Sequence, residues 1–160
     1  MDVNKLVETK QWIGGELERC VSFWLENGID REHGGVYTCL DRTGKIYSTD
    51  KSVWMQGRCG WIFAWLCHLY GNKPEWLAAS KSCLDFMERC CINPDANGRM
   101  YFTVTRDGKP LRKRRYWFSE TFYIIANAEY YIATGDEKYL ETALKYYDFV
   151  YGIYKNPSTD

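Results

Sequence analysis

Arg58 is the residue whose type and surroundings point most directly to chemistry. On a helical wheel of about 100° per residue it lies within about 60° of Trp54, Trp61 and Trp65, in the most aromatic stripe of the chain. A guanidinium keeps its charge there, so it must be paired, stacked on a ring or exposed to a wet cavity. The residues leave two interpretations open: an arginine that meets a ligand, or a structural arginine held by a buried carboxylate or by helix-end carbonyl groups.

Gly57 and Gly60 stand on either side of Arg58. Each glycine costs about 1 kcal/mol in a helix interior. Their presence therefore favours a close approach of another group to the backbone beside Arg58, and it shifts the balance towards a functional arginine. Gln56 falls about 200° from Trp54 on the wheel, off the aromatic stripe, and the pattern alone gives it no clear role.

A second aromatic stripe begins at Phe118 and includes Glu129. Glu129 lies about two turns, or ~10 Å, deeper in its helix than Arg58 lies in the other. This depth argues against a direct Arg58–Glu129 pair, so we interpret Glu129 as a structural carboxylate. Ser119 and Glu120 fall in the first turn of the second helix, where the residues alone favour capping and a favourable interaction with the helix dipole.

No other pattern matches a catalytic or metal-binding motif. The sequence has no glycine-rich phosphate loop, no G-x-S-x-G and no C-x-x-C, and His33 and His68 stand far apart without ligand spacing around them. Paired carboxylates for glycoside hydrolysis stay open, because no spacing selects them. The seven cysteines, with the vicinal pair Cys90-Cys91, are interpreted as reduced thiols. We therefore expect no metal ion and a reducing compartment.

Composition and charge argue against several classes of protein. The 21 basic and 21 acidic residues cancel, which argues against a nucleic-acid binder held by bulk electrostatics. The basic residues Lys109 and 112–115 are interpreted as solvated surface rather than as a nucleic-acid or localisation patch. No apolar run reaches the roughly 18 residues of a membrane span. The first ten residues lack the apolar core of a signal peptide, so we expect a cytoplasmic protein without a membrane partner.

An internal repeat organises the elements that must position these residues. YTCLDRTGKI, which begins at Tyr37, resembles YFTVTRDGKP, which begins at Tyr101, at an offset of 64 residues. The same offset carries Trp54 onto Phe118, and an offset of 63 fits the residues after Pro74. The identities are few, and chance similarity is the alternative. Because the order of features repeats as well, we predict one unit used twice.

Each unit is predicted to contain a β-hairpin and two helices. Gly71 and Gly135 are expected to end the long helices. Asn72 and Asp136 are expected to cap the helices that follow, with Glu75 completing a capping box after Asn72. The expected elements are an opening helix at about 4–27, hairpins at about 36–44 and 100–108, long helices at about 52–70 and 117–134, and second helices at about 74–91 and 137–152.

Helix pairs repeated at this length bury their faces against neighbouring units, in an open solenoid or in a closed α/α toroid. A hairpin between helix pairs favours the toroid. A six-unit toroid needs roughly 380 residues, so the 160 residues hold about two and a half units and cannot close such a ring by themselves. The predicted fold class is therefore all-α, with short β-hairpins between helix pairs.

Two segments carry a family resemblance. The segment 54–58, Trp-Met-Gln-Gly-Arg, followed by the aromatic helix, resembles the W-x-Q-x-R segment of the N-acylglucosamine 2-epimerase family. VTRDGKPLRKRRYWFSETFY, residues 104–123, resembles the matching hairpin and inner helix. The resemblance covers nearly the whole chain, and cellobiose 2-epimerases and aldose–ketose isomerases of mannose type are more distant relatives. It implies an (α/α)6 barrel whose lumen binds a sugar at the N-terminal ends of the inner helices, and we expect residues 1–160 to form the N-terminal portion of this single (α/α)6-barrel domain.

The implied reaction interconverts N-acetyl-D-glucosamine and N-acetyl-D-mannosamine, with two family histidines removing and returning the proton at C2. Arg58 matches the family's essential arginine, which would stabilise charge that develops on the sugar oxygens. The resemblance implies an amino sugar as ligand, no required cofactor, ATP as an activator and a homodimer for the full-length protein. Five further residues match positions near the same mouth and are predicted to bind substrate: Trp54, Gln56, Phe118, Ser119 and Glu120.

The sequence departs from the family in one respect. The family's catalytic histidines lie in later repeats, and neither His33 nor His68 matches them, so we expect the 160-residue chain alone to lack epimerase activity. Two alternatives remain: another aldose epimerase, isomerase or glycoside-active enzyme on an α/α toroid, and a non-catalytic interaction module whose aromatic stripes pack against a partner.

Overall fold

The computed structural model describes residues 2–113 and 116–157. In this part of the chain the order of hairpin, helix and helix predicted for each unit is confirmed. Arg114 and Arg115, two of the basic residues predicted to be solvated, lie outside the described residues, whereas Lys109, Arg112 and Lys113 are exposed. The described helices are α1 (Val3–Asn27), α2 (Val53–Tyr70), α3 (Pro74–Cys90), α4 (Phe118–Thr134) and α5 (Glu137–Lys155).

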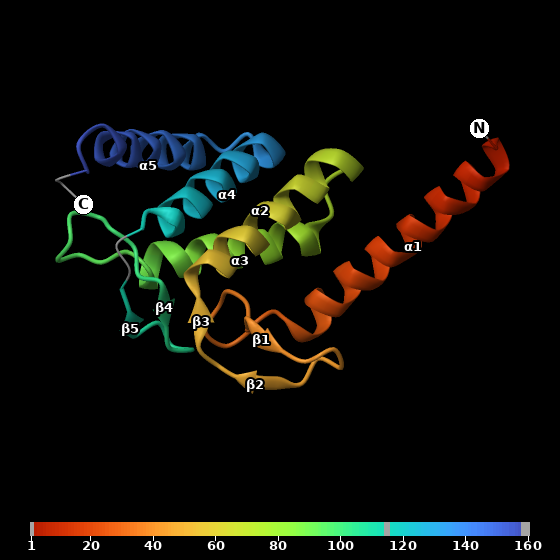
Figure 1. Ribbon diagram of the computed structural model, residues 1–160, viewed down its shortest axis with the longest axis horizontal. Helices are drawn as coiled ribbons and strands as arrows, with labels where there is room; N and C mark the ends of the chain where they lie inside the picture. Colours follow the sequence, from red (N-terminus) through yellow and green to blue (C-terminus); the bar gives the residue numbers. More distant parts are fainter. Residues whose placement is uncertain (1, 114–115, 158–160) are drawn as a thin grey trace.

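The helices form an open array. α2 packs against both α3 and α4, and α4 packs against α5 (Figure 1). The C-terminal half of α1 packs on a cluster that includes Phe63, Leu66 and Trp76, while its N-terminal half extends away from the body and leaves Leu6 and Trp12 exposed. None of the described helices is long and apolar enough to cross a membrane.

The strands are short and form two antiparallel sheets among the described residues. β1 (Cys39–Leu40) pairs with β2 (Ile46–Ser48), as predicted for the first hairpin. β4 (Thr103–Val104) pairs with β5 (Pro110–Arg112), as predicted for the second. The sequence did not predict β3 (Lys51–Ser52), which precedes α2 directly and pairs with β4 of the other unit. This pairing fixes the N-terminal ends of α2 and α4 beside the same sheet.

Equivalent hydrogen bonds confirm the repeat. The Gln56 side chain accepts from Val36 N at 2.8 Å, and the Glu120 side chain, 64 residues later, accepts from Met100 N at 2.8 Å. The two units therefore hold hairpin to inner helix in the same way. Two further equivalent pairs are the bonds Tyr37 N–Gly28 O and Tyr101 N–Cys91 O, and the bridges Ile29–Val36 and Ile92–Met100.

The ends of three helices follow their predicted signals. Gly71 and Gly135 end α2 and α4 with φ of 89° and 74°, in the region that glycine enters without steric cost. Asp136 is the N-cap of α5, and its side chain accepts from Lys138 N at 3.1 Å.

The predicted capping of α3 by Asn72 and Glu75 is wrong. Pro74 occupies the first helical position, where its fixed φ suits a helix start, so Lys73 becomes the N-cap. The Asn72 side chain donates instead to Ala133 O at 3.0 Å and ties the loop after α2 to the end of α4.

Candidate functional site

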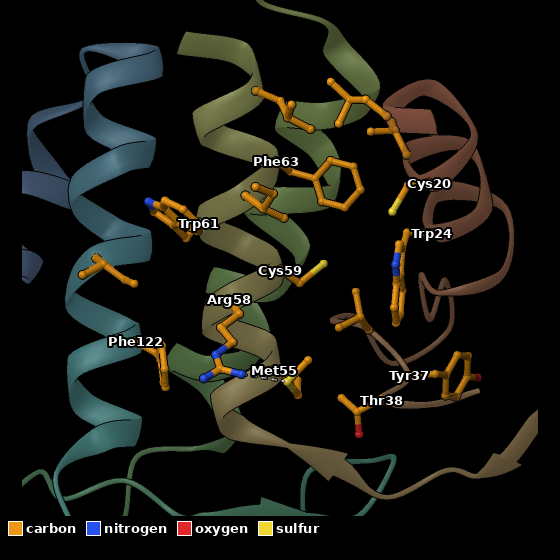
Figure 2. Close-up of a pocket in the computed structure, with 16 residues that line it drawn as sticks. Cys20, Trp24, Tyr37, Thr38, Met55, Arg58, Cys59, Trp61, Phe63 and Phe122 are labelled. Carbon is orange, nitrogen blue, oxygen red and sulfur yellow. Dashed lines mark hydrogen bonds between the residues drawn. The ribbon is translucent and has the colours of Figure 1, made fainter. Parts of the chain in front are cut away.

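Arg58 projects from the second turn of α2 towards α4 and has an exposed side chain (Figure 2). Its guanidinium carbon lies 4.6 Å from the centre of the Phe122 ring, and Nη1 lies 3.9 Å from Met55 Sδ. Within the described residues, no carboxylate is paired with it. An aromatic face and a thioether use little of a guanidinium's hydrogen-bonding capacity, so its N–H donors remain for oxygen atoms of a ligand.

The glycines beside Arg58 allow two helices to touch. A Cβ added at Gly57 would lie 2.6 Å from Phe122 Cβ, and one added at Gly60 would lie 3.5 Å from Ala126 Cβ. The close approach that these glycines predict is therefore made by α4. Its consequence is chemical as well as structural, because it brings the Phe122 ring against Arg58. Sequence reasoning missed Phe122, although the offset of 64 carries Arg58 onto it.

Trp54 and Phe118 continue the aromatic surface at the N-terminal ends of α2 and α4. The Trp54 ring centre lies 5.3 Å from that of Phe118 and 6.0 Å from that of Phe122, and Phe118 is 48% exposed. Ser119 turns inwards and donates to Tyr101 O at 3.0 Å. The structure thus brings Trp54 and Phe118, but not Ser119, to the surface that carries Arg58.

Gln56 and Glu120 lie beneath this surface and are fully buried. The Gln56 amide donates to Val36 O at 2.7 Å as well as accepting from Val36 N. Glu120 Oε1 accepts from Arg99 Nε at 2.9 Å and from Met100 N. Ser119 and Glu120 do not cap α4. All of these groups hold backbone segments beneath the site, and their assignment as substrate-binding residues stays a prediction.

A cavity of about 440 Å³, the α1–α2 hollow, opens beside Arg58 (Figure 2). Arg58 is the one charged residue among the described residues that line it, and the lining contains no histidine and no carboxylate. Among the described residues, the surroundings of Arg58 therefore offer neither a histidine nor a carboxylate to take a proton from a carbon atom. The lining includes Leu17, Cys20 and Trp24 of α1, and Met55, Cys59 and Ile62 of α2.

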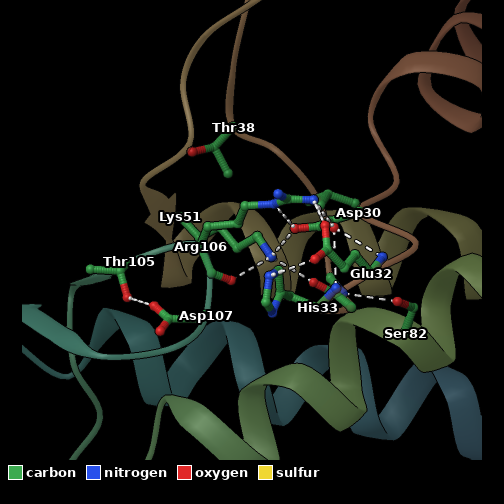
Figure 3. Close-up of polar contacts among 12 residues, drawn as sticks. Asp30, Glu32, His33, Thr38, Lys51, Ser82, Thr105, Arg106 and Asp107 are labelled. Atoms are coloured by element: carbon green, nitrogen blue, oxygen red, sulfur yellow. Dashed lines mark hydrogen bonds and ion pairs between the residues drawn. The ribbon is translucent and has the colours of Figure 1, made fainter.

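An ionic network around Asp30 fixes the start of α2 (Figure 3). Lys51 Nζ donates to Asp30 Oδ2 at 2.9 Å, Gly34 O at 2.7 Å and Arg106 O at 3.0 Å. Arg106 donates to both oxygens of Asp30, at 3.0 and 3.1 Å. The side chains of Asp30 and Lys51 are fully buried. Because Lys51 lies in β3, directly before α2, the network ties the helix that carries Arg58 to the loop before the first hairpin and to the second hairpin.

The network shifts the pKa values of its members. Burial alone raises the pKa of the Asp30 carboxyl, but hydrogen bonds from Arg106 and Lys51 outweigh it and hold that pKa well below its usual range. Burial lowers the pKa of Lys51, an effect that Asp30 opposes. The charged groups of Asp30, Lys51 and Arg106 bind one another, so we interpret the network as structural.

The far ends of α2 and α4 carry a separate polar pair. His68 Nδ1 lies 2.9 Å from Glu129 Oε1. Glu129 thus has a structural partner, in line with its interpretation from the sequence, but the partner is His68, which the pattern did not indicate. Among the described residues there is no group of three or more side chains that could hold a metal ion.

Known proteins resemble this chain in both sequence and structure. The family described as N-acylglucosamine 2-epimerase (GlcNAc 2-epimerase) matches residues 35–160. The chain belongs to the N-acylglucosamine 2-epimerase family. It is 38% identical over 156 residues to the N-acylglucosamine 2-epimerase of Homo sapiens, an alignment that covers 92% of this chain and 36% of that protein. The chain thus spans little more than a third of the relative's length.

Solved structures bear out the predicted fold class. A cellobiose 2-epimerase from Spirochaeta thermophila superposes with a TM-score of 0.74 at 26% identity, over 91% of this chain and 37% of that one. A D-mannose isomerase superposes with a TM-score of 0.77 at 18% identity, over 88% and 34%, and shows the fold alone. The chain has the helical arrangement of part of an (α/α)6 barrel, within a family of epimerases.

Proposed function

We propose that this chain forms the arginine-bearing part of the sugar-binding lumen of an enzyme that interconverts N-acetyl-D-glucosamine and N-acetyl-D-mannosamine. One observation carries the proposal: the Arg58 guanidinium is held by Phe122 and Met55 and keeps its N–H donors unspent. Removal of the C2 proton leaves negative charge on the sugar oxygens, and fixed N–H donors stabilise that charge. Trp54 and Phe118 offer ring faces to the apolar faces of a sugar beside it.

The base for this reaction belongs to another part of the proposed enzyme. Proton removal from C2 needs a base within hydrogen-bond reach, and the described residues that line the hollow beside Arg58 include no histidine and no carboxylate. His68 lies at the opposite end of α2, bonded to Glu129. The 160-residue chain by itself is therefore expected to give no turnover.

The repeat indicates where the rest of the lumen attaches. α4 packs on α2 and α3, with Phe122 against Gly57. Shifted back by one unit, the same arrangement places an inner helix on α1 and α2, at the α1–α2 hollow, with a small residue opposite Arg58. Phe122 and Ala126 of α4 and Cys83 of α3 lie against the glycines of α2. One unit earlier, the equivalent residues are Arg58, Ile62 and Cys20, and all three line the hollow. We propose that the hollow is the seat of a further inner helix of the ring.

A chimaera in which residues 1–160 replace the matching part of the human relative tests the proposal. We expect turnover of N-acetylmannosamine by the chimaera and none by the chain alone. Arg58→Met should abolish the activity, whereas Arg42→Met, on the exposed turn of the first hairpin, should preserve it. Turnover by the chain alone, or full activity of Arg58→Met, would contradict the assignment. Activity on cellobiose or mannose but not on N-acetylated sugars would favour another sugar epimerase or isomerase.

The proposal also includes an amino sugar as ligand, no required cofactor, ATP as an activator, a homodimer of the full-length protein and a cytoplasmic location. These properties rest on the family resemblance. ATP titration of the chimaera's activity and its mass in solution test two of them directly.

A further inference from the structure

We infer that Cys59 and Cys83 form a redox-sensitive pair, which hydrogen peroxide converts into a disulfide bond between α2 and α3. The inference concerns the helix that carries Arg58, but it does not depend on the proposed sugar reaction. Both cysteines are free thiols in the structure.

Cys59 of α2 and Cys83 of α3 lie where these two helices pack together. Cys59 is close enough to Cys83 to raise the pKa of the Cys83 thiol. A Cβ added at Gly60, next to Cys59, would lie 3.4 Å from Cys83 Cβ, and Ser80 Oγ donates to Gly60 O at 2.7 Å. The 3.4 Å distance belongs to the position beside Cys59, and it shows that α2 and α3 approach closely at the level of Cys59. A disulfide bond requires the Cβ atoms of Cys59 and Cys83 to lie about 3.5–4.5 Å apart.

The second unit shows independently that these two positions face each other. The residues equivalent to Cys59 and Cys83 are Tyr123 and Tyr146, and their ring centres lie 5.0 Å apart. The contact between these positions is thus part of the repeating unit. In the first unit it is filled by two thiols, which can be joined covalently.

The surroundings of the two cysteines assign their roles. Cys59 is partly exposed and lines the α1–α2 hollow, whereas Cys83 is fully buried. The contact with Cys59 and burial raise the pKa of Cys83, which disfavours its thiolate and makes Cys59 the first to react.

The chemistry then takes two steps. The Cys59 thiolate attacks a peroxide oxygen and the O–O bond breaks, which gives a sulfenic acid and a hydroxide that takes up a proton. Cys83 sulfur attacks Cys59 sulfur, the S–O bond breaks, and the hydroxyl leaves with the Cys83 proton as water. Two thiols are oxidised and one peroxide is reduced to two waters.

Peptide mapping of the native chain tests the pair. Trypsin cuts after Arg58, Lys81 and Arg89, so after peroxide treatment and alkylation the disulfide should join peptides 59–81 and 82–89. Cys67 shares the first peptide, and the experiment is therefore repeated in Cys67→Ser. We expect this linkage to dominate in both proteins, to disappear with dithiothreitol and to be absent from Cys59→Ser.

Two results would overturn the inference. One is a dominant link from Cys59 to Cys20, which also lines the hollow; the other is oxidation of Cys59 to a sulfinic acid with Cys83 left alkylated. Thermal unfolding of the wild-type chain provides a second measurement that needs no variant. The linked chain should unfold at a higher temperature than the reduced chain, because the bond closes the loop 59–83 in the unfolded state, and a lower temperature would show that the native geometry rejects the bond.

Discussion

The inner helices α2 and α4 are equivalent elements that carry different side chains on the same scaffold. Both are tied to their hairpins by a buried residue in the first turn, Gln56 in α2 and Glu120 in α4. Two residues further on, α2 has Arg58 where α4 has Phe122, and these equivalent residues touch each other. The comparison teaches that the repeat supplies the support, while one exchange of an aromatic residue for arginine supplies the chemistry.

The loops before the two hairpins differ in the same manner. Asp30 and Asn93, its equivalent at an offset of 63, both accept a backbone N–H two residues further on, at 3.1 Å. Asp30 in addition binds Lys51 and Arg106. The first unit has thus added an ionic network to a turn that the second unit keeps in its simple form.

The largest effect is expected at this pair of loop positions. Asp30→Ala leaves the buried Lys51 ammonium without its carboxylate partner and should lower the free energy of unfolding by about 3–5 kcal/mol. Asn93→Ala removes only local hydrogen bonds and should cost about 1 kcal/mol. Urea unfolding of both variants measures the difference. Equal losses would show that the network adds nothing to the turn.

A smaller loss of stability is expected from substituting Gln56 and Glu120, the two buried side chains that hold a hairpin to its inner helix. Gln56→Glu removes the donor to Val36 O and buries a carboxylate, and it should cost about 1–3 kcal/mol. Glu120→Gln keeps an acceptor for Met100 N, but it removes the negative charge opposite the buried Arg99 guanidinium and should cost a comparable amount. The same unfolding experiment compares the two variants, and a clearly smaller loss for Glu120→Gln would show that the ion pair with Arg99 adds nothing.

Two glycine substitutions, one at the contact between α2 and α4 and one in an open part of α1, test how closely the inner helices approach. Gly57→Ala places a methyl group 2.6 Å from Phe122 Cβ, and repacking of this kind costs about 1–3 kcal/mol, of which alanine regains about 1 through helix propensity. Gly14→Ala, in an open part of α1 with no neighbour within 4 Å, should instead stabilise the chain by up to about 1 kcal/mol. Thermal unfolding gives the sign of each change. Stabilisation by Gly57→Ala would contradict the close approach of α4.

The smallest effect is expected in the way the free energy of unfolding depends on pH. The pKa of Asp30 is lowered in the folded chain, so its stabilising share is fully present above the unfolded carboxyl pKa of about 4. That share is lost as the pH falls below this value. Asp30→Asn should flatten this part of the stability curve, and an unchanged acid slope would assign the loss to other carboxylates.

The sequence revealed regular features better than contacts between distant segments. Gly71, Gly135 and the offset of 64 were enough to place the hairpins and helices, because turn geometry and helix termination act over a few residues. The Asp30 network joins residues 30, 51 and 106, and no local pattern indicates such a meeting. Arg58 stands out in the sequence because it is a charged residue in an aromatic stripe. Its contact with the Phe122 ring depends on how closely α4 approaches Gly57, which no local pattern indicates.

The pairing of β3 with β4 sets an order of events during synthesis. Lys51 and Ser52 find their strand partners at Val104 and Thr103, so the ribosome must add roughly fifty residues before this edge of the first unit can form. Until then the Lys51 ammonium lacks the carbonyl of Arg106 as an acceptor. The start of the helix that carries Arg58 is therefore completed only when the hairpin of the following unit has emerged.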